Sequence, residues 1–254
     1  NQSNPSDSMK SNVAGTANML EIARQITVKK FLFMSSGAVY ERSKNQKKGY
    51  SEVDSLNPIL LYPTSKYFGE KLCDIFSETY NLPVCKIRLF NLYGPLQDYN
   101  RKHKAFLADV FYSLIKNKTM TLYNSNNKIK RDYLYIDDLV YLFIRLLSKN
   151  FLIKNITINA CSGENYSVGE IIKKVEEITK MKLKTNIANN PSNFWHKYKD
   201  LHYGKYKIKS EIIQNEVFKR AEGNPKLFKK ILNKKTTPLE IGLLECFKYA
   251  KKEI

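Results

Sequence analysis

The sequence predicts an α/β protein in which helices pack against a parallel sheet. Two short and mainly apolar runs, Phe31 to Met34 and Val84 to Phe90, have the composition of strands that are buried on both faces. Apolar residues at helical spacing precede each run, over residues 13–26 and from about Thr64 to Tyr80. Because a helix followed by a strand recurs with short connections, we expect right-handed crossovers and a parallel sheet.

Capping and turn residues predict where several elements begin and end. Asn81 and Pro83 end the helix that begins near Thr64. Ser167–Glu170 has the pattern of a capping box and opens a helix that runs to about Lys180. Thr237–Glu240 has the same pattern, with Pro238 at the first helical position, and opens the terminal helix. The other predicted segments are helices over 104–117 and 137–148, short strands near 120–123 and 156–160, loops over 37–61 and 91–100, and an irregular surface over 183–210.

The chain is strongly basic, with a formal net charge of +19 over 254 residues. Clustered cations are typical of nucleic-acid binding. Here 36 of the 43 basic residues are Lys and only seven are Arg, whereas specific nucleic-acid interfaces favour the donor fork of Arg. The lysines are also spread along the whole chain. We therefore do not expect a nucleic-acid partner, but a modest attraction for phosphate-bearing ligands.

The cysteine, histidine and apolar patterns exclude several other classes of protein. The four cysteines form no C-x-x-C pair and the three histidines have no metal-ligand spacing, so neither a zinc site nor a disulfide framework is expected. This cysteine usage fits a reducing cytoplasm. No apolar run is long enough to span a membrane, and the N-terminal residues lack the pattern of a secretion signal.

Tyr62 and Lys66 form a candidate acid/base pair. Residues four apart share one face of a helix, so the Lys66 ammonium is expected beside the Tyr62 phenol. A neighbouring ammonium lowers the pKa of a phenol from its usual value of about 10. The spacing alone selects nothing, because the chain contains five Tyr and Lys pairs at this distance in sequence, beginning at Tyr40, Tyr62, Tyr67, Tyr112 and Tyr203.

The ends of the two predicted strands distinguish the pair at Tyr62 from the others. Ser36 follows the first strand and Asn91 follows the second, while Tyr62 opens the helix between them. Ligands of open α/β sheets bind beyond the carboxyl ends of the strands. The sequence therefore predicts a site where a hydroxyl, an amide and the pair Tyr62 and Lys66 meet.

Six motifs, in this order and spacing, resemble those of the extended short-chain dehydrogenase/reductase family, which includes the NAD-dependent nucleotide-sugar epimerases and dehydratases. The motifs are Asn12–Thr16, Ser35–Tyr40, Tyr62 with Lys66, Arg88–Pro95, Arg131–Asp138 and Arg220–Pro225. The resemblance implies the C-terminal part of a doubly wound, Rossmann-type parallel-sheet domain with a smaller α/β substrate-binding lobe. Residues 1–118 are then the remainder of the dinucleotide-binding domain, to which elements near 131–160 return. Residues 119–254 mainly form the nucleotide-sugar-binding lobe.

The resemblance also implies the roles of the catalytic residues. Ser36 binds the reacting sugar hydroxyl and helps to share its proton, and Tyr62 is the base. Lys66 holds the nicotinamide ribose and lowers the pKa of Tyr62. Asn12 and Phe90 match positions that contact the cofactor, together with the three catalytic residues.

Asn91, Arg131 and Arg220 match residues that bind the nucleotide diphosphate, for which guanidinium forks are well suited. Two alternatives stay open at this point. Arg131 and its neighbour Asp132 have the pattern of a surface ion pair, and asparagine at position 91 is also a common turn residue.

The residues after Ser36 narrow the reaction. Dehydratases of the family have acidic residues there, whereas this chain has Gly37 and Ala38. The resemblance therefore implies an enzyme that epimerises a nucleotide-diphosphate sugar by transient oxidation and re-reduction, as UDP-glucose 4-epimerase does. The implied cofactor is NAD, with NADP as the alternative. A homodimer formed through the helices at 13–26 and 64–80 is also implied.

One expected feature is missing. A dinucleotide-binding fold needs a glycine-rich turn after its first strand, because the backbone must approach the pyrophosphate closely. The two nearest of the ten glycines, Gly163 and Gly169, are six residues apart. The alternatives to an epimerase are a keto-reductase or dehydratase of the same family, or a truncated and inert basic binding protein. The first methionine is Met9, which suggests that the numbering begins inside a longer enzyme.

Overall fold

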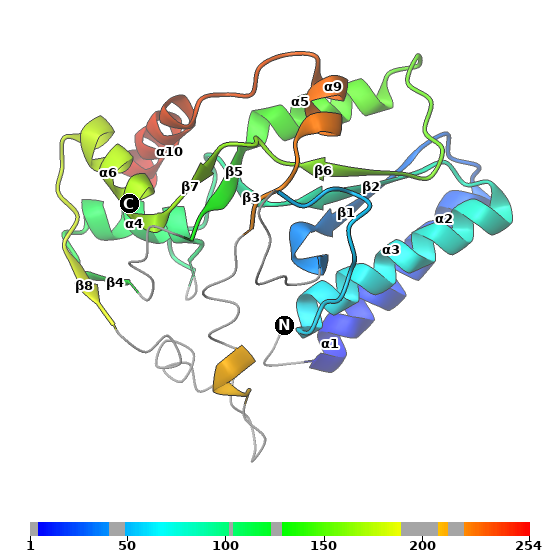
Figure 1. The fold of residues 1–254 in the computed structure, drawn as a ribbon, viewed down its shortest axis with the longest axis horizontal. Coiled ribbons are helices and arrows are strands. Elements are labelled where there is room, and N and C mark those ends of the chain that lie inside the picture. The colour runs from blue at the N-terminus through cyan, green and yellow to red at the C-terminus, as the bar shows by residue number, and fades with distance from the viewer. Residues whose placement is uncertain (1–4, 41–48, 102–103, 123–128, 189–207, 213–220) are drawn as a thin grey trace. The chain divides into compact units, whose positions relative to one another are not determined.

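The computed structural model of the chain describes residues 5–40, 49–101, 104–122, 129–188, 208–212 and 221–254 (Figure 1). The chain divides into two compact units. The first unit comprises residues 1–91, 139–163 and 221–235, and the second comprises residues 92–138, 164–220 and 236–254. The assignment of a cofactor-binding part and a sugar-binding part along the chain stays a prediction.

The first unit contains the predicted parallel sheet. Strands β1 (Phe31–Ser36), β2 (Val84–Leu89) and β6 (Ile156–Ala160) are all parallel, in the order β1-β2-β6. The register places Ser36 opposite Leu89 and Leu89 opposite Ala160, so the three strands end together at one edge. This edge is where a ligand of a parallel α/β sheet is expected.

Helices cover both faces of this sheet. In Figure 1, α2 (Gly15–Gln25) and α3 (Leu61–Tyr80) lie on one side of it, and α9 (Lys226–Leu232) lies on the other with the part of α5 (Ile136–Leu147) that belongs to this unit. Leu20 of α2, Cys73 of α3 and Phe33 of β1 form a buried cluster with Ala23, Leu82 and Val84. Asn81 ends α3 in the left-handed conformation, with φ of 56°, as its position predicts.

Two features of this unit differ from the sequence prediction. The helix expected over 13–26 begins earlier, with α1 (Pro5–Met9) and the π-helical segment η1 (Lys10–Ala14) leading into α2. Strand β1 was expected to be buried on both faces, but only Phe33 and Ser35 in it are buried. It is an outer strand in the described sheet, whereas the central strand β2 is buried along nearly its whole length.

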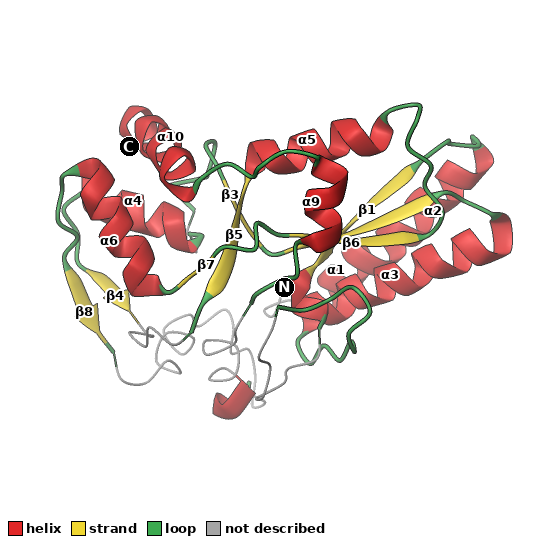
Figure 2. Cartoon of the chain, turned by 45° about the horizontal axis from the view of Figure 1, so that its top comes forward, coloured by secondary structure: helices red, strands yellow, loops and turns green. Residues whose placement is uncertain are grey.

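The second unit has its own sheets and core. Strands β3 (Asn91–Tyr93), β5 (Arg131–Tyr135) and β7 (Asn165–Tyr166) form one sheet, and β4 (Met120–Leu122) runs parallel to β8 (Thr185–Ile187). Figure 2 shows these two groups of strands with the surrounding helices. The helices are α4 (Phe106–Ile115), α6 (Val168–Thr179) and α10 (Leu239–Glu253). Buried side chains of these strands and helices form a core that is rich in aromatic rings, which include Tyr93 of β3, Phe111 of α4 and Tyr135 of β5.

The two predicted capping boxes have opposite outcomes. The first is confirmed, because Ser167 Oγ accepts from the N–H of Glu170 at 3.2 Å and Glu170 Oε2 accepts from the N–H of Ser167 at 2.7 Å. The second is wrong, because α10 begins after Pro238 without a side-chain cap. The N–H of Thr237 donates instead to Asp138 Oδ2 at 2.7 Å, which holds this segment in another conformation.

Short strands account for most other differences. Residues 91–100, expected to be a loop, begin with β3, and the described part of 183–210 contains β8. Strands β5 and β7 and helix α9 were not predicted. No helix in the described ranges is both long and apolar enough to cross a membrane. Within the same ranges, no group of three or more histidine, cysteine or acidic side chains is arranged to hold a metal ion.

Candidate active site

Ser36 occupies the carboxyl end of β1, at the edge where the three parallel strands end. Its backbone is extended, with φ of −144° and ψ of 141°, and its Oγ accepts from the N–H of Ala38 at 3.2 Å. This bond caps the short 3-10 helix η2 (Gly37–Val39), which turns the chain aside immediately after the strand. The turn leaves the Ser36 hydroxyl at the open edge of the sheet.

Tyr62 lies in the first turn of α3, and its phenol lies near the side chain of Ser36. Burial raises the pKa of the Tyr62 phenol, and the polar side chain of Ser36 opposes this effect without cancelling it. About a third of the residue, 36%, stays exposed. The phenol is therefore a proton donor at neutral pH, and it needs further stabilisation of its anion to act as a base.

Lys66 lies one helical turn after Tyr62. Its Nζ donates to the carbonyl oxygen of Met34 at 2.9 Å and lies 6.0 Å from the centre of the Tyr62 ring. Burial lowers the pKa of this ammonium. The structure thus brings Ser36, Tyr62 and Lys66 together at the strand ends. The expected lowering of the Tyr62 pKa by Lys66 is not found, because burial raises this pKa and only the Ser36 side chain opposes the rise.

Asn12 supports this arrangement from the π-helical segment η1. Its Nδ2 donates to Ser65 Oγ at 2.9 Å, and Ser65 Oγ donates to the carbonyl oxygen of Tyr62 at 2.7 Å. The two bonds connect η1 to the turn of α3 that carries Tyr62. Single turns of π-helix are often found at functional sites. The predicted contact between Asn12 and the cofactor stays a prediction.

Phe90 follows β2, and its ring packs against two glycines. A Cβ atom at Gly37 would lie 2.9 Å from the nearest atoms of this ring, and one at Gly223 would lie 2.7 Å from it. Both distances are too short for ordinary contact. The ring of Phe90 therefore occupies the space that a side chain at position 37 would need. In dehydratases of the family that the sequence motifs resemble, the residues after the serine include acidic ones.

The role of the three predicted diphosphate-binding residues stays a prediction. Asn91 follows Phe90 and begins β3, the strand next to β5 in the sheet order β3-β5-β7. Arg131 begins β5 in the second unit, and its neighbour Asp132 is fully buried and hence no surface carboxylate. Arg220 lies outside the described residues.

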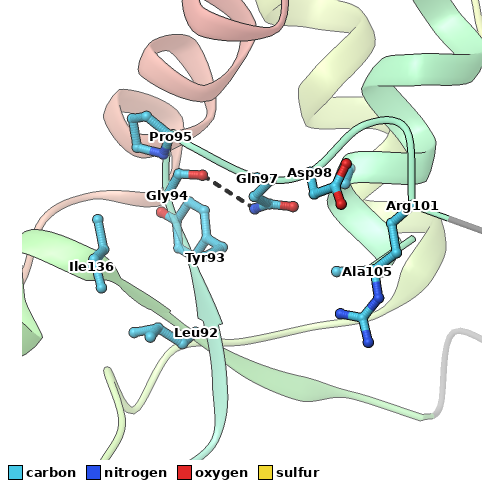
Figure 3. A pocket seen from close by; sticks show the side chains of 10 residues that line it. Leu92, Tyr93, Gly94, Pro95, Gln97, Asp98, Arg101, Ala105 and Ile136 are labelled. Carbon is cyan, nitrogen blue, oxygen red and sulfur yellow. Dashed lines mark hydrogen bonds between the residues drawn. The ribbon is translucent and has the colours of Figure 1, made fainter. Parts of the chain in front are cut away.

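A pocket of about 290 Å³ lies in the second unit and is lined in part by the last four residues of the Arg88–Pro95 motif (Figure 3). Gln97 Nε2 donates to the carbonyl oxygen of Gly94 at 3.2 Å in its wall, and Arg101 lies on the side near Ala105. Neither Gln97 nor Arg101 is among the predicted site residues, although both lie within six residues of that motif. The pocket is lined by Leu92, Tyr93, Gly94, Pro95, Gln97, Asp98, Arg101, Ala105, Ala108 and Ile136, and by none of the predicted site residues.

Comparison with known proteins decides the family. The model of the NAD dependent epimerase/dehydratase family matches residues 1–169. The chain belongs to this family. A curated relative, the uncharacterized UDP-glucose epimerase YtcB of Bacillus subtilis, is 32% identical over 188 residues, which are 72% of this chain and 57% of the relative. UDP-glucuronate 4-epimerase 4 of Arabidopsis thaliana is 28% identical over 205 residues, which are 75% of this chain and 46% of that protein.

Solved epimerases of the family confirm the fold. UDP-glucose 4-epimerase of Thermotoga maritima, solved with UDP-glucose, superposes with a TM-score of 0.80 at 23% identity, over 98% of this chain and 72% of the enzyme. UDP-glucuronic acid 4-epimerase of Bacillus cereus, solved with UDP-glucuronic acid and NAD, gives 0.75 at 21% identity, over 96% and 68%. The predicted Rossmann-type α/β fold is therefore confirmed. The chain spans about half the length of the curated relatives it matches.

Proposed function

We propose that the protein is an NAD-dependent epimerase that acts on a nucleotide-activated sugar by transient oxidation and re-reduction. The observation that carries this proposal is the meeting of Ser36, Tyr62 and Lys66 at the carboxyl edge of the parallel sheet, where Lys66 Nζ donates to the carbonyl of Met34 and lies 6.0 Å from the centre of the Tyr62 ring. The names of the relatives support it, since they include UDP-glucose and UDP-glucuronate 4-epimerases.

The residues present fit one end of NAD. An ammonium has three N–H donors, and the bond from Lys66 to Met34 uses one of them, so the others can bind the hydroxyls of the nicotinamide ribose. We propose that Phe90, which follows the end of β2, contacts the same end of the cofactor. None of the chain's glycines forms the glycine-rich turn, so no residue is assigned to the pyrophosphate. NADP is the alternative cofactor.

The proton chemistry follows from the geometry. The Tyr62 phenol and the Ser36 hydroxyl lie near each other at the strand ends, so one sugar hydroxyl bound there can contact both oxygens. Tyr62 takes the proton of this hydroxyl and Ser36 helps to share it, while the Lys66 ammonium stabilises the phenolate. NAD, when bound, accepts a hydride from the sugar carbon and returns it. We propose that Lys66 lowers the pKa of Tyr62 only when the cofactor and the sugar are bound.

The packing around Gly37 favours epimerisation over dehydration. A dehydratase needs an acid near the leaving hydroxyl, and the ring of Phe90 fills the space of a side chain at position 37. A keto-reductase is the second candidate, because it would use the same three residues, but it would start from a keto sugar and would take the hydride from NADH or NADPH, which is consumed.

The substrate that we propose is a nucleoside-diphosphate sugar. Asn91, Arg131 and Arg220 are the residues proposed to bind its diphosphate, since guanidinium groups form paired hydrogen bonds with phosphate oxygens. The nucleotide in the names of the cited relatives is UDP.

We also propose a homodimer that forms through α2 and α3. These adjacent helices expose large apolar side chains that a second copy of the chain would cover. The exposed residues are Met19, Ile22 and Ile26 of α2 or its end and Phe68, Ile75 and Tyr80 of α3.

Replacing Tyr62 by Phe tests the assigned base. Turnover of UDP-glucose or UDP-glucuronic acid with NAD should be lost, while binding of the nucleotide sugar, measured by calorimetry, should be unchanged. Tyr67→Phe is the matched control, because Tyr67 and Lys71 have the same spacing on the same helix, with Lys71 Nζ 5.6 Å from the Tyr67 ring centre. Equal turnover in wild type and Tyr62→Phe would refute the assignment. Binding of DNA at physiological salt, with no binding of nucleotide sugars, would instead support the basic binding protein.

A further inference from the structure

A cluster of buried polar side chains lies behind the end of β1 and takes no part in the chemistry described above. It consists of Ser35, Tyr40, Glu70, Arg88 and Asn159, each at most 4% exposed. We call it the Arg88 cluster. These residues come from β1, the turn after it, α3, β2 and β6, so the cluster connects every element that forms the active-site edge of the first unit.

Both carboxylate oxygens of Glu70 are occupied within the Arg88 cluster. Arg88 Nη2 donates to Glu70 Oε2 at 2.7 Å, and Arg88 Nε donates to Oε1 at 3.0 Å. The hydroxyl of Ser35 also donates to Oε1. A buried carboxylate that accepts two hydrogen bonds from one guanidinium forms a strong ion pair with a defined geometry.

Other members of the cluster fix the guanidinium. Arg88 Nη1 donates to Tyr40 Oη at 2.8 Å and to the carbonyl oxygen of Glu52 at 2.9 Å. Tyr40 Oη in turn donates to Asn159 Oδ1 at 2.6 Å. Arg88 therefore has little freedom to turn away from Glu70.

Glu70 lies one helical turn after Lys66, on the same face of α3. The two side chains reach adjacent residues of β1, since Lys66 Nζ donates to the carbonyl of Met34 and Glu70 accepts from Ser35. A buried carboxylate that loses its cation must find another or take up a proton. The cation nearest along this helix face is the ammonium of Lys66.

We propose that Arg88 is a positioning residue whose ion pair with Glu70 keeps the Lys66 ammonium available to Tyr62 and to the ribose of the cofactor. Without Arg88, Glu70 captures Lys66 and draws it down the helix, away from the Tyr62 ring. This inference rests on the proposed function for the role of Lys66, but the ion-pair exchange itself requires neither cofactor nor sugar.

The other charged groups around α3 are paired elsewhere or lie at other positions of α3 or on other elements, so we do not expect them to take the place of Arg88 beside Glu70. Lys86 of β2 pairs with Asp74, one turn beyond Glu70 on α3. On α2, Glu21 and Arg24 pair with each other at 2.6 Å. The remaining titratable groups on the elements packed against α3 are Asp7 of α1, Lys10 of η1 and Cys85 of β2. Those on α3 itself are Tyr62, Tyr67, Lys71, Cys73, Glu78 and Tyr80.

The test replaces Arg88 by Met and follows the pKa of Lys66 by NMR of its side chain in the protein without ligands. Capture by Glu70 should raise the pKa of Lys66 by about one unit or more, since an opposite charge within a few ångströms favours the charged form. The double variant Arg88→Met with Glu70→Gln should return this pKa to its wild-type value. Arg88→Lys, which keeps a cation beside Glu70, should also leave it unchanged.

Lys86→Met is the matched control, because it breaks the other ion pair between β2 and α3 without freeing a carboxylate next to Lys66. It should leave the pKa of Lys66 at its wild-type value. If Arg88→Met does not fold, Arg88→Gln, which keeps a donor but no charge, carries the same expectation. An unchanged Lys66 pKa in the charge-removing variant, or a shift that the double variant does not reverse, would overturn the proposal and leave the proposed function intact. If the wild-type protein showed no turnover, this would contradict the proposed function but not the exchange of ion pairs.

Discussion

Replacing Gly37 by Ala should destabilise the protein, because the new methyl group would collide with the ring of Phe90. The added Cβ would lie 2.9 Å from two atoms of this ring, and a Cβ at Gly223 would lie 2.7 Å from the same ring, so the ring is already packed closely against the backbone of Gly223. Overpacking of this kind costs about 1–3 kcal/mol. The lower chain entropy of Ala in the unfolded state offsets about 0.4–1 kcal/mol. We therefore expect a net loss of about 1–2 kcal/mol.

Thermal unfolding followed by circular dichroism measures this loss. For a chain of this size, about 1–2 kcal/mol lowers Tm by roughly 2–8 °C. Gly15→Ala is the control, since its Cβ would meet only the carbonyl oxygen of Lys10, at 3.9 Å, and the change should raise Tm slightly. Adding Phe90→Leu to Gly37→Ala should recover part of the loss. A Tm for Gly37→Ala at or above that of Gly15→Ala would refute the packing argument.

Two further predictions concern a helix cap and alkaline pH. Ser167→Ala removes the confirmed capping box of α6 and should cost about 1 kcal/mol in urea unfolding, whereas Thr237→Ala, at a position without a side-chain cap, should cost much less; equal losses would contradict the assignment. Burial raises the pKa of the thiols of Cys73, Cys85 and Cys246 to about 12, from 9.0 in the unfolded chain. Their contribution to stability is fully present below pH 9 and is lost as the pH rises towards 12, because the unfolded chain releases these protons first. The urea midpoint should therefore fall between pH 8.5 and pH 10.5, and a midpoint that rises over this interval would contradict the burial of the thiols.

The central part of the fold and of the site could be predicted from local patterns. The apolar run of β2 and the helical spacing of α3 are signals contained in a few consecutive residues. The meeting of Ser36 and Tyr62 followed from topology, because the carboxyl ends of parallel strands share one edge of a sheet. These parts of the prediction needed no knowledge of contacts between distant residues.

The parts that could not be predicted depend on such contacts. Strands β3 and β7 contain three and two residues, too few for a periodic pattern, and exist only through pairing with β5. The ion pair between Glu70 and Arg88 joins residues 18 apart in sequence, and nothing near either residue predicts the other. Likewise, the reason for glycine at position 37 becomes visible only when the ring of Phe90 is placed against it.

The most direct measurement of the central claim uses UDP-glucose or UDP-glucuronic acid deuterated at carbon 4 of the sugar, incubated with the protein and NAD in ordinary water. If Tyr62 moves only the hydroxyl proton while the hydride leaves and returns within one site, NMR should show the C4 epimer with deuterium still at carbon 4. NAD should not be consumed, and Tyr62→Phe should form no product. Loss of the deuterium to solvent, or accumulation of a reduced or dehydrated sugar in place of the epimer, would contradict the account.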